Sequence, residues 1–304
     1  MSTASELTPP TLVENSSIEN TWTNSELTDI KLVQLWLHDK SAKSQRKISL
    51  LIKRFLNFIN KPLSHLTIED LHAYSDNIKL HYSNDGTRKN HITSIKSLLR
   101  FGHRLGYLPH NLGEFLKVPK IKNDLAERIV SSEQIMQMIA LEKNPRNQLI
   151  IKLLYATGIR NEELCKLKWR DVQRRSDEAT QINVYGKGSK TRSIIVPKSL
   201  ANALWKFRGD ATLDDPVFPS KKRKHGGHLD TSSIERVVKA ARERAGIERP
   251  VVPHSFRHAH ASHSLEQGAP IHLVRETLGH CSIKITAQYL HVRPSDSSAR
   301  FLLD

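Results

Sequence analysis

Residues 278–289 of the chain read LGHCSIKITAQY, which places His280 nine positions before Tyr289. Upstream, His254 and Arg257 lie three positions apart in the motif HSFR. Histidine and arginine side chains can bind a phosphate, and a tyrosine beside them can act as a nucleophile. Each piece alone is weak, because a lone tyrosine or histidine is more often a half-buried structural residue. The interpretation therefore depends on whether the rest of the sequence supplies the other parts of one mechanism.

The charge of the chain indicates a polyanionic partner. Its 304 residues carry a formal net charge of +16. Residues 1–30 contain five of the 31 acidic residues and no Lys or Arg, so the remaining chain holds 47 basic residues against 26 acidic ones. Such an excess favours nucleic acid as the partner, although a basic surface that is merely solvated is the alternative.

Several classes of protein do not fit the sequence. Two cysteines, Cys165 and Cys281, cannot build a disulfide framework or a zinc site of paired cysteines, and free thiols fit a reducing cytoplasm. No apolar run approaches the ~18 residues that span a membrane, and the first residues lack the pattern of a secretory signal. No glycine-rich nucleotide-binding loop is present. We therefore expect a cytoplasmic protein that has no membrane partner and no nucleotide cofactor.

Hydrophobic periodicity divides the chain into a small helical domain and a larger, mostly helical domain. Within the second domain, residues 181–197 alternate as in two strands joined by a glycine-containing turn. The fold class is thus mainly α with a small β-hairpin or sheet. The predicted parts are a flexible leader (1–24), a domain of four helices (25–115), a basic linker (116–126) and the second domain (127–304), which ends in an apolar tail (294–304).

Local signals mark several helix ends. Thr67 with Asp70 predicts a capping box, and Asn84 precedes a further helix. A serine cap at residues 131–132 opens the first long helix of the second domain. Gly158, in the segment TGIRNEEL, suits a helix end where a residue with positive φ is needed.

Two basic residues precede the His254 motif. Arg160 is expected at the start of a helix, where its guanidinium could hold a phosphate, and the alternative is a surface arginine paired with Glu163. Lys187 lies in the predicted hairpin turn, from which a long amine can reach a bound phosphate, and the alternative is a solubilising lysine. The run of lysine and arginine at 221–224 is most simply a basic loop.

Four histidines near position 260 raise the question of a metal site. His254 and His258 share a helix face, and His260 and His263 follow. No acidic residue lies between them as in the helical zinc peptidase motif, so a metal site is disfavoured.

Taken in order, these residues resemble the tyrosine recombinase, or phage integrase-like, family, and most closely its short Xer-type members. The resemblance covers residues 25–300. Phe256 and His260 depart from the residues usual in the family, but neither removes a catalytic group. The positions that match are Arg160 with Glu163, Lys187, His254 with Arg257, His280, and Tyr289.

The resemblance implies an architecture and a mechanism. The helical domain would be a SAM-like core-binding domain, and with the α+β catalytic domain it would form a C-shaped clamp on DNA. Tyr289 would attack the scissile phosphate to form a 3′-phosphotyrosyl bond. Arg160 and Arg257 would hold the non-bridging oxygens, with a hydrogen bond from His280.

The remaining matched residues would assist this chemistry. Lys187 would protonate the 5′-oxygen leaving group, and His254 would act as a base or a phosphate ligand. Glu163 would orient Arg160 from behind. The resemblance implies that no metal, ATP or other cofactor takes part.

The resemblance also implies partners. These would be double-stranded DNA with an inverted-repeat site and three further protomers, engaged through the tail 294–304, in a homotetramer or in a heterotetramer with a paralogue. An activating DNA translocase is a further possible partner. Resolution of chromosome or plasmid dimers is the expected role. Integration of a mobile element, a type IB topoisomerase and a DNA-binding protein without catalysis are the alternatives.

Overall fold

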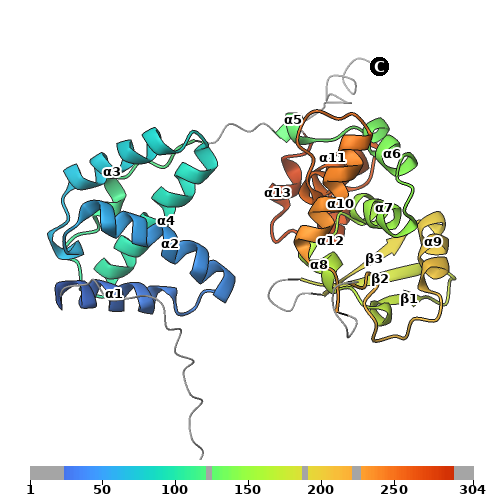
Figure 1. Ribbon diagram of the computed structural model, residues 1–304, viewed down its shortest axis with the longest axis horizontal. Coiled ribbons are helices and arrows are strands. Elements are labelled where there is room, and N and C mark those ends of the chain that lie inside the picture. The colour runs from blue at the N-terminus through green and yellow to red at the C-terminus, as the bar shows by residue number, and fades with distance from the viewer. Residues whose placement is uncertain (1–23, 121–124, 187–190, 221–226, 291–304) are drawn as a thin grey trace, which may run out of the picture. The chain divides into compact units, whose positions relative to one another are not determined.

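The computed structural model describes residues 24–120, 125–186, 191–220 and 227–290 (Figure 1). The leader up to residue 23, the turn that carries Lys187, the basic loop at 221–224 and the tail 294–304 lie outside these residues. The chain divides into two compact units, residues 1–122 and 123–304. The division falls within the linker predicted at 116–126.

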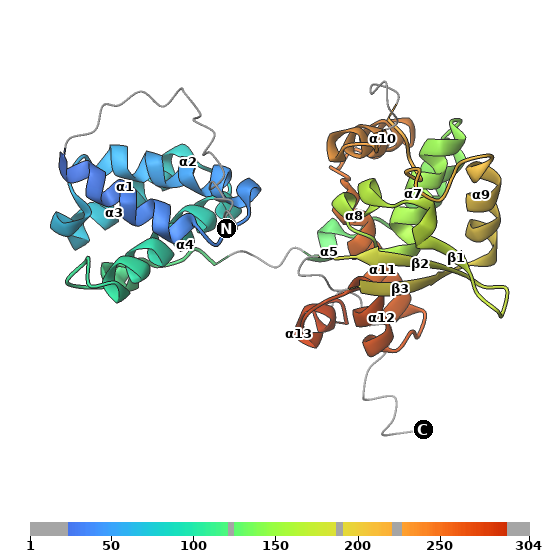
Figure 2. The same cartoon turned by 90° about the horizontal axis from the view of Figure 1, so that it is seen from below.

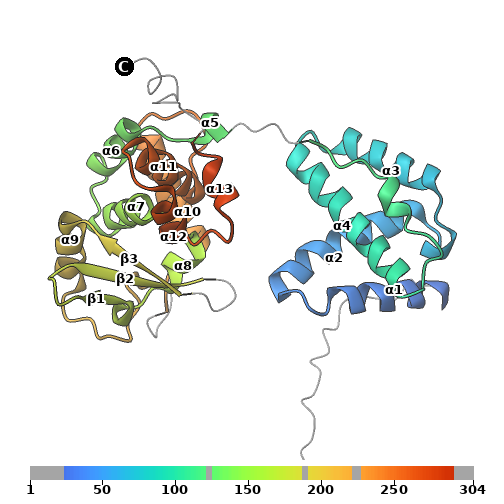
Figure 3. The ribbon, with the colours of Figure 1, turned by 180° about the vertical axis from the view of Figure 1, so that it is seen from behind.

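Four α-helices make up the described part of the first unit. Helix α4 contacts the other three (Figure 3). Thr67 and Asp70 form the predicted capping box of α3, and the Asn84 side chain caps α4 by accepting from the N–H of Thr87. The elements are α1 (Asn24–Leu37), α2 (Ala42–Ile59), η1 (Leu63–His65), α3 (Ile68–His81), α4 (Asp85–Arg104) and η2 (Leu112–Phe115).

A buried carboxylate holds the first helix of this unit in place. Asp29 is 4% exposed. Its two oxygens accept from the backbone N–H of Leu63 at 2.9 Å and from the hydroxyl of Tyr107 at 2.6 Å. Because a buried charge is costly unless its oxygens are hydrogen-bonded, these contacts fix α1 against the segments that follow α2 and α4.

The second unit is mostly helical, as predicted, and Ser131 caps α6 together with Gln134. Helix α11 lies at its centre, in contact with α7, α10 and α12. No helix in the described ranges is long and apolar enough to cross a membrane. The helices are α5 (Leu125–Arg128), α6 (Ser132–Ala140), α7 (Pro145–Thr157), α8 (Asn161–Lys166), α9 (Lys198–Arg208), α10 (Thr231–Arg244), α11 (Pro253–Glu266), α12 (Ile271–Leu278) and α13 (Ile283–Ala287), with a 3₁₀ turn η3 (Trp169–Asp171).

A small antiparallel sheet, ordered β1-β2-β3, completes this unit. The predicted hairpin is β2 (Thr180–Tyr185) with β3 (Thr191–Val196), and Ile182 lies opposite Ile194 in its register. A third strand, β1 (Val172–Arg174), was not expected, because three residues are too few to show an alternating pattern. Strand β3 contacts both α7 and α12, which Figure 2 shows on opposite sides of the sheet.

Two glycines end the helices that lead into the candidate site. Gly158 follows α7 with φ of 57°, as predicted, and Gly279 follows α12 with φ of 64°. This left-handed conformation is strained for any residue with a Cβ. At Gly158 a Cβ would also clash with Cδ2 of Leu278, so the ends of α7 and α12 approach each other too closely for a larger residue.

We expect Gly158→Ala to lower the free energy of unfolding by about 3 kcal/mol, since backbone strain and the clash with Leu278 act together. Gly246→Ala is the matched control, because Gly246 follows the end of α10 with φ of 64° and has no atom within 4 Å of its Cβ position. The control should lose only about 1 kcal/mol. Chemical denaturation of both variants measures the difference, and equal losses would contradict the close contact of α7 with α12.

Candidate active site

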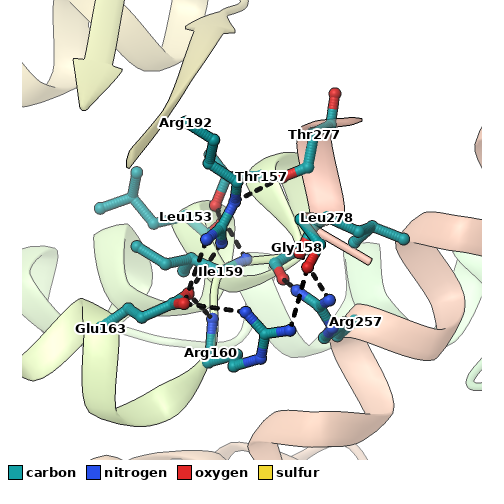
Figure 4. A network of polar contacts seen from close by, with 11 residues as sticks. Leu153, Thr157, Gly158, Ile159, Arg160, Glu163, Arg192, Arg257, Thr277 and Leu278 are labelled. Carbon is teal, nitrogen blue, oxygen red and sulfur yellow. Dashed lines mark hydrogen bonds and ion pairs between the residues drawn. The ribbon is translucent and has the colours of Figure 1, made fainter. Parts of the chain in front are cut away.

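A buried arginine joins the ends of two helices. The side chain of Arg257, on α11, is 2% exposed. Its guanidinium donates to the carbonyl oxygen of Gly158 at 2.7 Å and to that of Leu278 at 2.6 Å (Figure 4). Burial and the charges of Arg160 and Arg192 lower the pKa of Arg257, but a guanidinium stays protonated at neutral pH. The carbonyls at a helix C-terminus lack partners within the helix and carry partial negative charge, so they suit this cation.

Arg160 lies two residues beyond Gly158, at the start of α8. Its guanidinium donates to Glu163 at 2.9 Å and to the carbonyl oxygen of Gly279 at 3.5 Å. The alternative suggested by the sequence, a pair with Glu163, is therefore present. The pair does not place Arg160 away from the site, because its side chain is 42% exposed while Glu163 is 7% exposed. The carboxylate thus supports Arg160 from the protein interior.

Glu163 also binds a second arginine. Arg192, on β3, donates to both carboxylate oxygens, at 3.0 and 2.7 Å, and its Nε donates to the carbonyl oxygen of Thr277 at 2.7 Å (Figure 4). Burial acts to raise the pKa of Glu163, but the hydrogen bonds from Arg192 and Arg160 outweigh it and hold the pKa below its ordinary value. One ionised carboxylate therefore links α8, β3 and the end of α12.

His280 lies two residues beyond Leu278, the last residue of α12. Its Nδ1 lies 2.9 Å from the hydroxyl oxygen of Thr286. Burial and the charges of Arg257 and Arg160 lower the pKa of His280 to about 4, so the ring is neutral at pH 7. When Nδ1 accepts from the Thr286 hydroxyl, the proton of the ring lies on Nε2, which is then a neutral hydrogen-bond donor.

Tyr289 lies just beyond α13 and is 7% exposed. Burial raises its pKa, against the charge of Arg257. Its hydroxyl lies 2.7 Å from Nδ1 of His258, and the ring of His258 stacks edge-on against His254 at 4.5 Å. Burial, with the charges of Arg257 and Arg160, lowers the pKa of His254. The two histidines and the tyrosine therefore form a row beside the arginines.

The structure brings five of the six candidate catalytic residues into one region. Their proximity is reflected in the effect of Arg257 on the pKa values of His254, His280 and Tyr289. The sixth residue, Lys187, lies outside the described residues, so its position stays a prediction. Among the described side chains, no group of three or more His, Cys, Asp or Glu is placed to hold a metal ion.

Sequence reasoning missed two residues of this region. Arg192 could have been found from the sequence. It lies at every second position of β3 with the inward-facing Ile194 and Val196, and a basic residue on that face needs a buried partner. His258 was considered only as a metal ligand. Its contact with Tyr289 joins residues 31 positions apart and leaves no pattern in a single sequence.

Comparisons with known proteins identify the family of the chain. Residues 128–296 match the model of the phage integrase family. The chain is similar to the tyrosine recombinase XerC of Corynebacterium efficiens, with 32% identity over 79% of this chain and 77% of the relative. It is also similar to XerD of Oceanobacillus iheyensis, with 30% identity over 68% of this chain and 71% of that protein. The match to XerA of Pyrococcus furiosus is 35% identical and spans 59% of this chain and only 62% of the relative.

Solved structures share the fold. A lambda integrase dimer bound to a COC′ core site matches with a TM-score of 0.72 and 18% identity, over 91% of this chain and 80% of that one. XerH bound to its difH substrate before cleavage matches with a TM-score of 0.64 and 18% identity, over 91% of this chain and 88% of that one. At these identities the likeness establishes the fold alone.

We expect Glu163→Gln to lower the free energy of unfolding at pH 7 by about 3 kcal/mol, because it leaves the largely buried Arg192 without its counterion. A carboxylate whose native pKa is lowered stabilises the fold fully above its ordinary pKa of about 4.3, and the contribution is lost as the pH falls through the lower native value. The difference in free energy of unfolding between the unsubstituted protein and Glu163→Gln should therefore shrink below about pH 4.

Denaturant titrations across this pH range measure the difference. Asp177→Asn is the control, since Asp177 and its partner Arg175 are both exposed and their pair should contribute under about 1 kcal/mol. A difference for Glu163→Gln that stayed constant down to low pH would contradict the ionised network.

Proposed function

The chain belongs to the phage integrase family, and we propose that it is a site-specific tyrosine recombinase that cuts and rejoins double-stranded DNA through Tyr289. Two relatives that it matches over two thirds or more of their length carry the names tyrosine recombinase XerD and tyrosine recombinase XerC. Resolution of chromosome or plasmid dimers is therefore the role that we propose, with an inverted-repeat sequence as the DNA site.

The observation that carries the proposal is the bond of Arg257 to the ends of α7 and α12. It holds Arg160 and His280, each two residues beyond a bonded carbonyl, around a common region beside Tyr289. Arg160 and Arg192 share the single carboxylate of Glu163, and Arg257 donates to two carbonyl oxygens, so positive charge remains for a phosphate. Positive groups fixed in advance stabilise the charge that builds on the non-bridging oxygens as a phosphodiester reacts.

The proposed reaction cycle follows from these groups. The oxygen of Tyr289 attacks the phosphorus atom, and the bond from phosphorus to the 5′-oxygen breaks. Arg160, the N–H groups of Arg257 that the carbonyls of Gly158 and Leu278 leave unused, and the Nε2–H of His280 donate to the non-bridging oxygens. Lys187 protonates the leaving 5′-oxygen. A 5′-hydroxyl of the partner strand then reverses the step. Because the phosphotyrosyl bond keeps the energy of the ester, the cycle consumes no ATP and calls for no metal ion.

Exposed basic side chains on the first unit support DNA as the substrate. They project from α2 and α4 and can neutralise backbone phosphates, so binding should weaken steeply as salt is raised. They include Lys47, Lys53 and Arg54 on α2 and Lys89 and Arg100 on α4.

We expect Tyr289→Phe to bind the DNA site with near-normal affinity and to form no covalent adduct, because only the attacking oxygen is removed. A library of duplexes with randomised inverted half-sites identifies the preferred site. A nick placed beside the scissile phosphate then traps the cleaved intermediate, and a denaturing gel separates protein linked to DNA from free protein.

Tyr82→Phe is the matched control, because it removes the hydroxyl of a tyrosine in the first unit that accepts from Arg54. It should still form the adduct. Adduct formation by Tyr289→Phe at the normal level would refute the assignment of the nucleophile.

Assembly into a tetramer is the second part of the proposal. A cavity of about 460 Å³ lies among α6, α7, α9 and α11, with Met136, Ile139, Ala156 and Leu200 in its lining. Residues 294–304 include the apolar Phe301, Leu302 and Leu303. Apolar side chains of this size suit such a cavity, so we propose that the tail of one protomer docks there on its neighbour.

We expect deletion of residues 294–304 to abolish cooperative binding to the two half-sites and to leave binding to one half-site intact. Met136→Glu, which puts a charge at the cavity, should have the same effect. A mixture of the two variants should recover cooperativity, because an intact tail can then meet an intact cavity. Gel-shift titrations measure this, and unchanged cooperativity after the deletion would contradict docking of the tail.

A further inference from the structure

The hydroxyl of Tyr289 contacts a histidine that none of the roles above uses. Its oxygen lies 2.7 Å from Nδ1 of His258, within the range of a strong hydrogen bond. The two rings lie 5.8 Å apart and are tilted by 40°. The contact joins α11 to the segment after α13, so it depends on the tertiary fold.

His258 is held firmly in this position. It lies on α11 one residue after the buried Arg257 and packs edge-on against His254, four residues earlier on the same helix face. Tyr289 is fixed as well, because its ring lies in a cluster with Leu125, Ala261 and other apolar side chains. The geometry of the tyrosine oxygen and the imidazole nitrogen is therefore set before any substrate binds.

The attack by Tyr289 needs a proton acceptor. A phenol is a weak nucleophile until its proton leaves, and burial raises the pKa of this one further. A guanidinium cannot accept a proton, so the neighbouring arginines cannot do so. Nδ1 of His280 contacts the hydroxyl of Thr286, and the ring of His254, the base that the family resemblance implies, packs against the ring of His258. The nitrogen within hydrogen-bond reach of the phenol belongs to His258.

We propose that His258 is a catalytic residue that accepts the proton of Tyr289 during DNA cleavage, an inference that rests on the recombinase function proposed above. As the bond from the phenol oxygen to phosphorus forms, the O–H proton passes to Nδ1 of His258. The bond from phosphorus to the 5′-oxygen breaks, and that oxygen takes a proton from the general acid. In the rejoining step the imidazolium returns its proton to the phenol oxygen, so the cycle ends with both groups restored.

The experiment compares single-turnover cleavage of the nicked site by four proteins. His258→Asn puts an amide oxygen near the position of Nδ1, so it keeps a hydrogen-bond acceptor but provides no base. We expect it to cleave about a hundredfold more slowly. In both backgrounds Tyr289 is then replaced by a fluorinated tyrosine, whose more acidic phenol needs less help to lose its proton. In His258→Asn, this replacement should raise the cleavage rate at least tenfold.

His263→Asn is the matched control, because His263 lies on the same helix and its Nδ1 contacts the hydroxyl of Tyr155 at 2.9 Å. It removes a similar contact away from Tyr289 and should cleave at close to the normal rate. Thermal unfolding and DNA binding establish that each variant is folded.

The outcomes separate the two proposals. Cleavage by His258→Asn at the normal rate, or a deficit that the fluorinated tyrosine leaves unchanged, would overturn the role of His258 alone. Absence of any adduct with the unsubstituted protein on its selected site would overturn the recombinase function and this inference with it.

Discussion

The buried guanidinium of Arg257 is the interaction on which the candidate site depends. Its two hydrogen bonds reach the C-terminal ends of α7 and α12, which are more than 100 residues apart in the chain. Both bonded carbonyls belong to helix ends whose partial negative charge offsets the cost of burying a cation. Removing the guanidinium would leave two buried acceptors without partners and would release the elements that carry Arg160 and His280.

The ion pairs of Glu163 connect this arrangement to strand β3 of the sheet. Glu163 neutralises part of the charge of Arg160 and Arg192, and Arg192 also bonds to the end of α12 at Thr277. The carboxylate lies behind the arginines, on the side of the protein interior, and so it does not compete with an incoming anion. The site therefore keeps a net positive charge without destabilising the fold, because each of its buried charges has a hydrogen-bonded partner.

Sequence reasoning succeeded where a signal is local. The capping box at Thr67, the helix that follows Asn84 and the left-handed end at Gly158 each follow from one or two residues and the backbone groups next to them. It failed for β1, whose three residues carry no pattern. Short helices such as α5 are also missed in sequence analysis, because tertiary packing and not helix propensity stabilises them.

For the candidate site, the sequence indicated which residues take part but not the contacts that position them. Residue types, order and family resemblance indicated Arg160, Arg257, His280 and Tyr289, because these carry the chemistry that a phosphodiester demands. The contacts that position them could not be read from the sequence. Arg192 reaches Glu163 across 29 positions and His258 reaches Tyr289 across 31, and only the packed structure brings such residues together.

In the proposed reaction, Tyr289 forms a covalent bond to DNA beside the arginine side chains that the contacts of Arg257 and Glu163 hold in place. The most direct test traps the unsubstituted protein on a nicked copy of its site, digests the adduct with protease and nuclease, and sequences the modified peptide by mass spectrometry. We expect a nucleotide joined through its 3′-phosphate to Tyr289. A nucleotide attached to any other residue, or joined through a 5′-phosphate, would contradict it.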